Sequence, residues 1–241
     1  MQQNKRLPSW EYIGILLMRT FGNFLIFSSL FVIAKTFYQP VSEEVKYFVN
    51  QQTQKEYVVA APQEAPIVEK KYEQIAPKGA LAQALNIKPV EVLVPKDPQY
   101  SIVIPKIGAN ANIIRNINAA NETEYLDALQ HGVAHAAGTA YPGEGGHIFL
   151  FAHSTDYIWN VGTYNAVFYL LYKLEIGDEV NLFYNGTRHV YKVTGKEVVD
   201  PSQVEYLTRK TDTEFLTLQT CWPPGTTLKR MLVFAEPVVQ E

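Results

Sequence analysis

An uncharged apolar run near the amino terminus divides this chain of 241 residues into two unlike parts. Residues 20–34 carry no charge, and Ile13–Met18 adds apolar length on the other side of Arg19. About 20 apolar residues cross a bilayer, so a span over residues 20–38 is feasible when Arg19 lies at one interface and Lys35 reaches toward the other. We therefore expect a single transmembrane anchor followed by a separate body.

The charges around this run predict its orientation. The cationic residues that precede it are Lys5, Arg6 and Arg19. Positive charge stays on the cytoplasmic side of a membrane, so the body is expected on the outer side. The alternative is a cleaved signal peptide with residues 32–34 as the cleavage site. The stretch before the apolar run is long for such a peptide and contains Trp10 and Tyr12, which favours the anchor. The body is exported in both cases.

Overall charge and cysteine content exclude several classes of function. The chain has 21 Lys and Arg residues against 24 Asp and Glu, a net charge of −3. The first 40 residues are basic, so the remainder is acidic and is not expected to bind nucleic acid. Cys221 is the only cysteine, which rules out an intramolecular disulfide and a cysteine-rich zinc site. We expect no cofactor and no bound metal.

The distribution of prolines separates a linker from a folded head. Residues 43–57 favour a helix with three apolar residues on one face, namely Val45, Phe48 and Val49. Beyond it, prolines interrupt every longer candidate element: Pro62, Pro66, Pro77, Pro89, Pro95 and Pro98. The prediction is a cytoplasmic or interfacial amino terminus over residues 1–19, the anchor over 20–38, an extracytoplasmic stalk over 39–99 and the head over 100–241.

The head is rich in short strands. They are expected at residues 101–104, 111–117, 147–152, 179–184, 188–199, 215–220 and 229–235. Helices are expected at 123–130 and 167–174, the first followed by a Gly/Ala-rich loop up to Gly146. Asn185-Gly186 between two alternating segments is a strong signal for a tight hairpin. Many short strands with few helices indicate a mainly β fold, a closed or nearly closed β-barrel.

Two side chains at strand ends are candidates for chemistry. Cys221 follows the apolar run 215–220 and precedes Trp222-Pro223-Pro224-Gly225, so its sulfur is expected beside a loop, where functional residues gather. The alternative is a passive cysteine that acts as a small hydrophobe. His153 ends the strand 147–152 in a similar way. A histidine near a thiol supports thiolate–imidazolium chemistry, because the imidazolium stabilises the charged sulfur and can later protonate a leaving amine.

The other four histidines are weaker candidates. His147 and His189 fall inside expected strands, where a structural histidine is the commoner case. His131 and His135 lie in or beside the Gly/Ala-rich loop and remain possible partners of the thiol.

Arg230 is the third candidate. It opens the strand that follows the Cys221 loop, and an antiparallel return would bring it beside the sulfur. Its guanidinium can hold a substrate carbonyl or a developing oxyanion, whereas the alternative is an arginine in a surface ion pair. Lys229 is a neighbouring cation, but successive strand residues face opposite sides, so only one of the two can point toward Cys221.

Together these residues resemble the sortase family. The family signature Thr-Leu-x-Thr-Cys reads Thr217-Leu218-Gln219-Thr220-Cys221, and the order His153, Cys221, Arg230 is that of the family. The resemblance covers about residues 100–237 and includes residues 102–107 (IVIPKI), which are similar to the first barrel strand. It implies a closed eight-stranded sortase-type β-barrel with a few short helices, preceded by a transmembrane helix.

The resemblance also implies an activity. Sortases are cysteine transpeptidases on the outer face of the cell membrane that cleave a sorting motif near the carboxyl end of secreted proteins. Cys221 would form a thioacyl intermediate, His153 would move protons to and from the amines, and Arg230 would stabilise the oxyanion. Thr220 and Trp222 would contribute to substrate binding. The acceptor amine would come from a cell-wall peptide precursor or a pilin lysine.

Two departures from the family pattern refine this reading. The residues flanking the histidine are commonly Gly and Arg, and here they are Ala152 and Ser154, which affects the fine positioning of His153. Pilin-polymerising members often carry an Asp-Pro-aromatic plug; residues 97–100 (DPQY) match it only in part and are interpreted as a turn. A housekeeping or class D/E-like sortase is therefore favoured over a pilin polymerase.

Two other enzyme classes and one non-enzyme were weighed. L,D-transpeptidases need Ser-x-Gly-Cys, and papain-like peptidases need a cysteine at the start of a helix; neither pattern is present. The non-enzyme alternative is a membrane-anchored β-barrel binding module with a passive Cys221. Tyr157, Trp159 and Tyr164, which follow His153, would line a substrate groove or pack at its rim.

Overall fold

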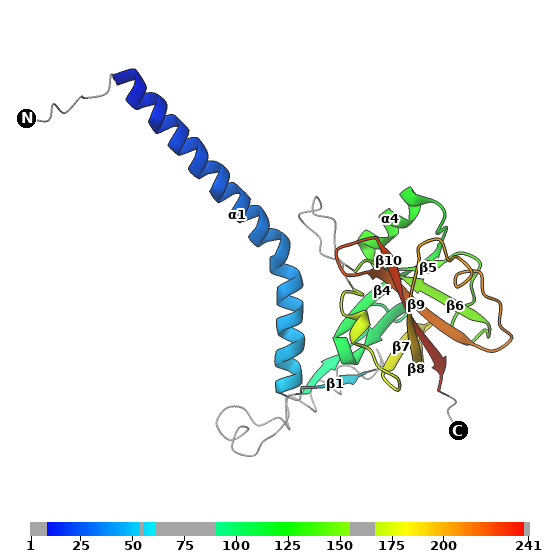
Figure 1. Cartoon of the computed structure of the whole chain (residues 1–241). Coiled ribbons are helices and arrows are strands. Elements are labelled where there is room, and N and C mark those ends of the chain that lie inside the picture. Colours follow the sequence, from blue (N-terminus) through cyan, green and yellow to red (C-terminus); the bar gives the residue numbers. More distant parts are fainter. Residues whose placement is uncertain (1–8, 54, 61–89, 155–166, 239–241) are drawn as a thin grey trace, which may run out of the picture. The chain divides into compact units, whose positions relative to one another are not determined.

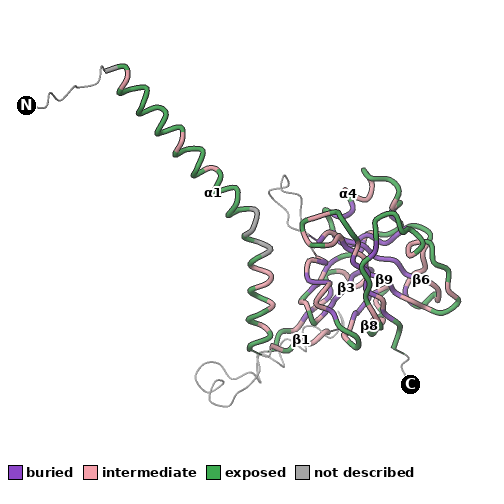
Figure 2. Tube along the Cα trace, in the orientation of Figure 1, coloured by how far each residue is buried: buried purple, intermediate pink, exposed green. Residues whose placement is uncertain are grey.

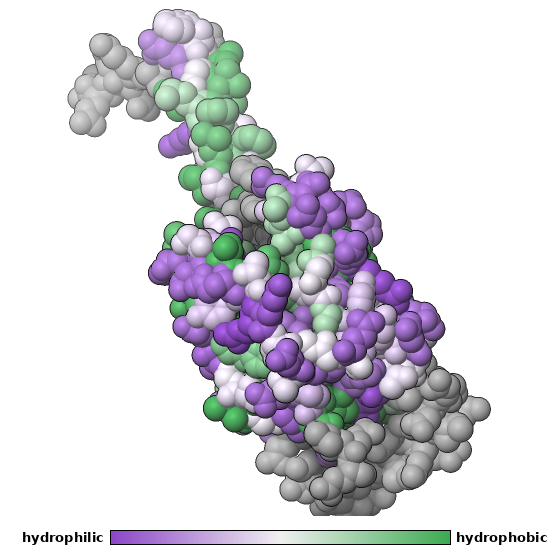
Figure 3. All heavy atoms as spheres, turned by 90° about the vertical axis from the view of Figure 1, so that its right-hand side faces the viewer, coloured by the Kyte–Doolittle hydropathy of each residue, from purple (hydrophilic) through white to green (hydrophobic). Residues whose placement is uncertain are grey.

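The computed structural model describes residues 9–53, 55–60, 90–154 and 167–238. The chain forms two compact units, Met1–Ser42 and Glu43–Glu241. Helix α1 (Ser9–Gln52) runs through the whole predicted anchor and ends in the second unit (Figure 1). Its stretch Trp10–Lys35 is long and apolar enough to cross a membrane, and it begins amino-terminal to the predicted span. Hydrophobic side chains gather on this helix, while the barrel surface in the same view is largely hydrophilic (Figure 3).

The second unit contains a closed eight-stranded barrel, as predicted. Its strands follow one another around the barrel in the order β10-β8-β7-β3-β4-β5-β6-β9. Their bounds are β3 Tyr100–Ile104, β4 Ala109–Ile117, β5 Val133–Ala136, β6 His147–Phe151, β7 Glu179–Tyr184, β8 Thr187–Val199, β9 Phe215–Trp222 and β10 Lys229–Pro237. The described helices of the head are short, with α4 at Glu122–His131 and 3₁₀ turns η1 at Pro105–Ile107 and η2 at Leu171–Lys173.

Local sequence accounts for several of these elements. Asn185 and Gly186 both have positive φ, 50° and 78°, which is the geometry of the tight hairpin that joins β7 and β8. Helix α4 begins after Asn121, whose side chain accepts a hydrogen bond from the backbone N–H of Glu124. Strand β6 is buried along its whole length, which agrees with its uninterrupted apolar sequence.

The barrel interior is the hydrophobic core. Side chains from every barrel strand contribute to it, and the largest fully buried ones include Tyr100, Phe149, Leu182 and Tyr191. Figure 2 shows the buried residues concentrated on the barrel strands. The core therefore holds the strand ends, and the residues that follow them, in fixed positions.

Two predictions about the head were wrong. The segment predicted as a helix at 167–174 is, over its described residues, a turn followed by η2. Its buried residues are Phe168, Leu170, Leu171 and Leu174, and only Leu171–Lys173 form a 3₁₀ turn, a type of helix that occurs in short pieces. The predicted Gly/Ala-rich loop contains strand β5, which pairs in parallel with β4.

Parts of the predicted stalk carry regular structure in the unit that contains the barrel. Helix α1 ends at Gln52, and β1 (Glu56–Val59) pairs in parallel with β2 (Val90–Leu93). Leu93 packs with Val103 and Phe183 on the outside of the barrel, and Arg188 donates to the carbonyl of Val59 at 3.3 Å. Residues 61–89 lie outside the described part, and the functional division into anchor, stalk and head stays a prediction.

Candidate active site

Cys221 and Arg230 lie directly opposite each other on neighbouring strands. Strands β9 and β10 are antiparallel, and Arg230 is the Cα partner of Cys221. Directly opposed residues of such a pair place their side chains on the same face of the sheet. Both residues are half-buried. The expected return of the chain from the Cys221 loop is therefore observed, and it brings the thiol and the guanidinium to one face at one end of the pair.

His153 follows strand β6, which borders β9 on the side opposite β10. Strands β6 and β9 are parallel with Phe151 opposite Gln219, and the N–H of Ala152 donates to the carbonyl of Gln219 at 3.1 Å. Continuing this register by two residues places His153 beside Cys221. The three residues named by the sequence analysis thus come from the ends of three adjacent strands.

Thr220 ties two of these strand ends together. Its side chain is buried, and its hydroxyl donates to the carbonyl of Ala152 at 2.9 Å. Ala152 and Thr220 immediately precede His153 and Cys221, so this hydrogen bond holds the two backbones side by side. A contact of Thr220 with substrate stays a prediction.

Replacement of Thr220 by valine tests this tie. The Thr220→Val side chain keeps the shape but leaves the buried carbonyl of Ala152 without the hydroxyl donor, so we expect the free energy of unfolding to fall by about 1–2 kcal/mol. Urea titration at neutral pH measures it. Thr187→Val, an exposed position on β8, is the control and should change stability by less than about 0.5 kcal/mol. Equal effects of both substitutions would contradict the role assigned to Thr220.

The environment of Cys221 favours a protonated resting thiol. Burial raises its pKa, and the positive charge of Arg230 offsets part of this by lowering it. Burial disfavours the thiolate because the charge is less well solvated there. A nucleophile in this position needs a base to take its proton when it reacts.

The contacts of Arg230 and Lys229 separate the two cations. Arg230 donates from Nη1 to the carbonyls of Thr227 and Lys229, at 3.0 and 3.1 Å. Lys229 forms an ion pair with Asp200 at 2.7 Å and lies opposite Trp222 in the sheet. Arg230 is therefore the cation on the Cys221 face of the sheet, and the two hydrogen bonds of its Nη1 orient the guanidinium.

The remaining histidines occupy structural positions. His147 is buried and bonded to Thr217 at 2.8 Å, and His135 is buried on β5 and bonded to Thr139 at 2.8 Å. Burial lowers the pKa of each to about 4. His131 ends α4 and bonds through Nδ1 to the carbonyl of Asp127 at 2.9 Å. The structural role expected for His147 is observed, and His135 belongs to the same class.

Sequence reasoning missed Tyr172. This residue of η2 packs its ring against that of Trp222, with ring centroids 5.2 Å apart. Trp222 is half-buried and borders Cys221 in the chain. The segment was expected to be a helix, and no pattern links it to the cysteine loop. The aromatic candidates Tyr157, Trp159 and Tyr164 lie outside the described residues.

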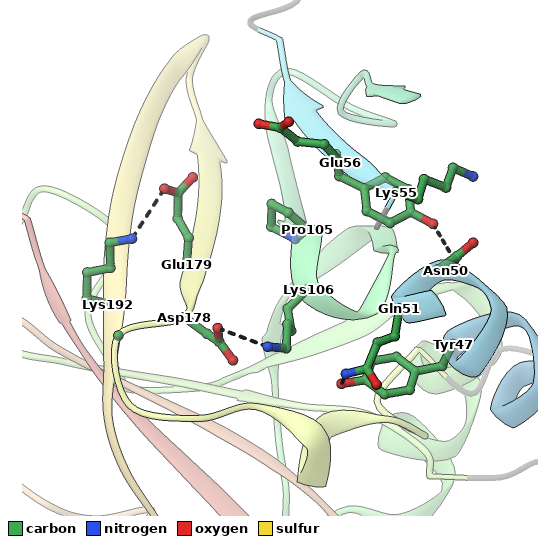
Figure 4. A pocket seen from close by; sticks show the side chains of 12 residues that line it. Tyr47, Asn50, Gln51, Lys55, Glu56, Pro105, Lys106, Asp178, Glu179 and Lys192 are labelled. Carbon is green, nitrogen blue, oxygen red and sulfur yellow. Dashed lines mark hydrogen bonds and ion pairs between the residues drawn. The ribbon is translucent and has the colours of Figure 1, made fainter. Parts of the chain in front are cut away.

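A polar cavity of about 520 Å³ lies beside the end of α1 (Figure 4). It is bounded by α1, β1, η1 and the start of β7, and neither Cys221 nor Arg230 lines it. Lys106 pairs with Asp178 at 3.7 Å, and Lys192 pairs with Glu179 at 3.6 Å. The positive charges of these lysines are thus balanced by neighbouring carboxylates, and the candidate catalytic residues lie elsewhere.

Comparison with known proteins places this arrangement in a family. Residues 102–238 match the family model of the sortase domain. The chain is 29% identical over 138 residues to a sortase D of Bacillus subtilis, with 56% of this chain and 61% of that protein covered. The chain thus spans less than two thirds of the length of that relative.

The chain is also similar to solved structures. The crystal structure of sortase C-1 from Actinomyces oris matches with a TM-score of 0.50 at 30% identity, covering 60% of this chain and 76% of that chain. A sortase D5 transpeptidase of Clostridium perfringens matches with a TM-score of 0.48 at 22% identity, covering 70% and 95%. Because the family model spans more than half of the sequence, this chain belongs to the sortase family, and its similarity to a sortase D fits the class D/E-like reading.

Proposed function

We propose that this chain is a membrane-anchored sortase whose active site consists of Cys221, His153 and Arg230. It cleaves a carboxyl-terminal sorting motif of secreted proteins and joins the new carboxyl end to an amine. The observation that carries the proposal is the strand register, in which Arg230 is the direct partner of Cys221 and the parallel register of β6 leads to His153. The similarity to a sortase D supports a class D/E-like member.

The first half-reaction forms a thioester. Sulfur of Cys221 attacks the carbonyl carbon of the scissile peptide bond, and its proton passes to the imidazole of His153. The imidazolium then gives that proton to the departing amine as the carbon–nitrogen bond breaks. The raised pKa of the Cys221 thiol means that this proton is still on sulfur in the resting enzyme, so proton removal accompanies the attack.

The second half-reaction reverses these roles. The incoming amine attacks the thioester carbonyl and loses its proton to His153, and the sulfur leaves and regains a proton. Atoms and charges balance, because a peptide bond is broken and a new amide bond is formed without an oxidant, a metal or a cofactor. The amine is proposed to belong to a peptidoglycan precursor or a pilin lysine, and Trp222 to border the bound peptide.

Arg230 is proposed to stabilise the oxyanion in both half-reactions. Its backbone is opposite Cys221 and its Nη1 is held by two carbonyls, so the rest of the fork has a defined direction. A guanidinium offers two parallel donors to one oxygen-bearing group, whereas an ammonium is a point charge.

Substitution of Arg230 by lysine tests the fork. Arg230→Lys keeps the positive charge but loses the paired donors, so we expect kcat to fall by about 10²-fold. Lys229→Gln removes the adjacent cation, which pairs with Asp200, and is expected to keep kcat within about twofold. Steady-state kinetics with one peptide and one amine measure both. Full activity of Arg230→Lys would assign the arginine to the surface instead.

The anchor follows from the apolar stretch Trp10–Lys35 and the charges that precede it. We propose a single-pass protein with a cytoplasmic amino terminus and an extracytoplasmic barrel. Its partners are then secreted proteins with a sorting motif, an amine acceptor and the lipid bilayer.

The proposal as a whole is tested with the detergent-solubilised full chain. A panel of fluorogenic sorting peptides is offered with and without an added amine, and products are identified by mass spectrometry. Cleavage that iodoacetamide abolishes, with an amide product only when amine is present, supports the sortase. No cleavage of any peptide, together with a thiol that alkylates slowly, would favour a binding module with a passive Cys221.

A further inference from the structure

The carboxyl-terminal turns of α1 contact the barrel through their polar face. Within the unit that starts at Glu43, the half-buried residues of these turns include Glu44, Tyr47 and Asn50. Their spacing of three residues places them on one side of the helix. The apolar residues Val45 and Phe48 are 53% and 61% exposed on the other side. The side that faces the barrel is therefore the one that carries hydrogen-bonding groups.

Glu44 makes the contact that reaches toward the candidate active site. Its carboxylate accepts a hydrogen bond from the phenol of Tyr172 and pairs with Lys173 at 3.3 Å. The ammonium of Lys173 also lies 5.3 Å from the ring centre of Tyr47. One carboxylate and one phenol of α1 thus hold the two adjacent residues of η2.

The segment that contains η2 contacts both Trp222, the neighbour of Cys221, and the backbone of His153. The ring of Tyr172 packs against Trp222, the residue after Cys221, with centroids 5.2 Å apart. At its start, the N–H of Phe168 donates to the carbonyl of His153 at 3.4 Å. Buried Leu171 and Leu174 fix the segment in the core, and Lys196 donates to the carbonyls of Tyr172 and Leu174, each at 2.9 Å.

We propose that Tyr172 is a positioning residue for the active site, and that Glu44 of α1 holds it in place. The proposal rests on the proposed function of Cys221 and His153. Trp222 is half-buried and follows Cys221 in the chain. The orientation of its indole therefore determines the shape of the peptide site at that point. The ring of Tyr172 packs against that indole and fixes its orientation. The hydroxyl of Tyr172 in turn is held by its hydrogen bond to Glu44 of α1.

The docking of α1 is narrow, which makes it sensitive to single substitutions. Polar cavities of about 520 and 320 Å³ lie along the same turns, and Figure 4 shows Tyr47, Asn50 and Gln51 facing the first. Asn50 donates to the phenol of Tyr57 on β1 at 2.8 Å. With polar cavities beside these turns, the helix depends on a few directed contacts rather than on buried apolar area.

Two substitutions and a matched control test the proposal in the detergent-solubilised full chain. Tyr172→Phe keeps the ring but breaks its link to α1, and Glu44→Ala removes the acceptor. Glu43→Ala is the control, because Glu43 pairs with Lys46 on the same helix. Each is made in the background Trp10→Phe, Trp159→Phe, which leaves Trp222 as the only tryptophan of the chain.

We expect the two test variants to raise KM for a sorting peptide about three- to tenfold while kcat changes less than about twofold. The emission of Trp222 should shift to longer wavelength, and iodoacetamide should alkylate Cys221 faster, because the indole no longer packs as closely. Glu43→Ala should match the parent in all three. A merely structural role would lower the melting temperature but leave KM and the emission of the folded protein unchanged.

The outcomes separate this proposal from the proposed function. If the unsubstituted chain turns over no peptide, the proposed function fails, and the Trp222 emission and the alkylation rate of the variants still decide the coupling. If Tyr172→Phe and Glu44→Ala match Glu43→Ala in emission, alkylation and KM, the positioning role is wrong. If only one of the two differs from the control, the link between α1 and Tyr172 is wrong.

Discussion

Cys221→Ala is expected to lower the rate of peptide cleavage and of amine transfer by more than about 10³-fold, because no other group of the site can form the thioester. The substitution removes one sulfur from a half-buried strand end, so the free energy of unfolding should change by less than about 1 kcal/mol. Kinetics and urea titration of the same preparation measure both.

Two companion variants sharpen this result. Cys221→Ser replaces the thiol by a hydroxyl of similar size, which is a far weaker nucleophile at the same position, so this variant should be nearly as inactive. His153→Gln should remain alkylated by iodoacetamide while losing turnover, because the thiol persists and the proton carrier does not. Residual turnover of Cys221→Ala above about 10% of the parent rate would show that the nucleophile is another residue.

Acidification is expected to destabilise the barrel between about pH 6.5 and pH 4, through His135 and His147. Burial lowers the pKa of both to about 4 in the folded chain, against about 6.5 in the unfolded chain. The unfolded state therefore binds more protons in this window. The stabilising contribution is complete above pH 6.5 and is lost as the pH falls toward 4.

The expected loss in the free energy of unfolding is large for a single domain. A shift of this size corresponds to about 3 kcal/mol for each histidine, against a typical total of about 5–15 kcal/mol. Urea titrations between pH 7 and pH 5, followed by near-ultraviolet circular dichroism, should show stability falling with a slope that approaches the uptake of two protons. A pH-independent stability across this range would contradict the prediction.

Sequence patterns recovered the elements that depend on neighbouring residues. The hairpin around Asn185-Gly186, helix α4 and the apolar strand β6 are all observed, because turn geometry, capping and burial pattern are local properties. Strand β5 was missed, since its four residues pair in parallel with β4 and carry little strand propensity of their own. The elements β1 and β2 were missed because each is short and pairs with a segment that is distant in the chain.

The candidate site likewise combines contacts that were predictable from the local sequence with contacts between distant segments that were not. An antiparallel return after the Cys221 loop was predictable from chain order, and it places Arg230 correctly in register. The tie between Thr220 and Ala152 depends on the parallel pairing of β6 and β9, whose residues are 68 positions apart. The contacts of Tyr172 with Glu44 and Trp222 join three separate segments. No periodicity in the chain encodes such encounters.

Strand order has a consequence for the time at which the enzyme becomes able to react. The barrel is closed by β9 and β10, which come last among the described strands, and β9 lies between β10 and the much earlier β6. Pairings of this sequence separation form late and slowly. A nascent chain that ends before Lys229 has its cysteine but neither the partner strand nor the arginine. The face that carries both Cys221 and Arg230 is therefore complete only once β10 has paired with β9.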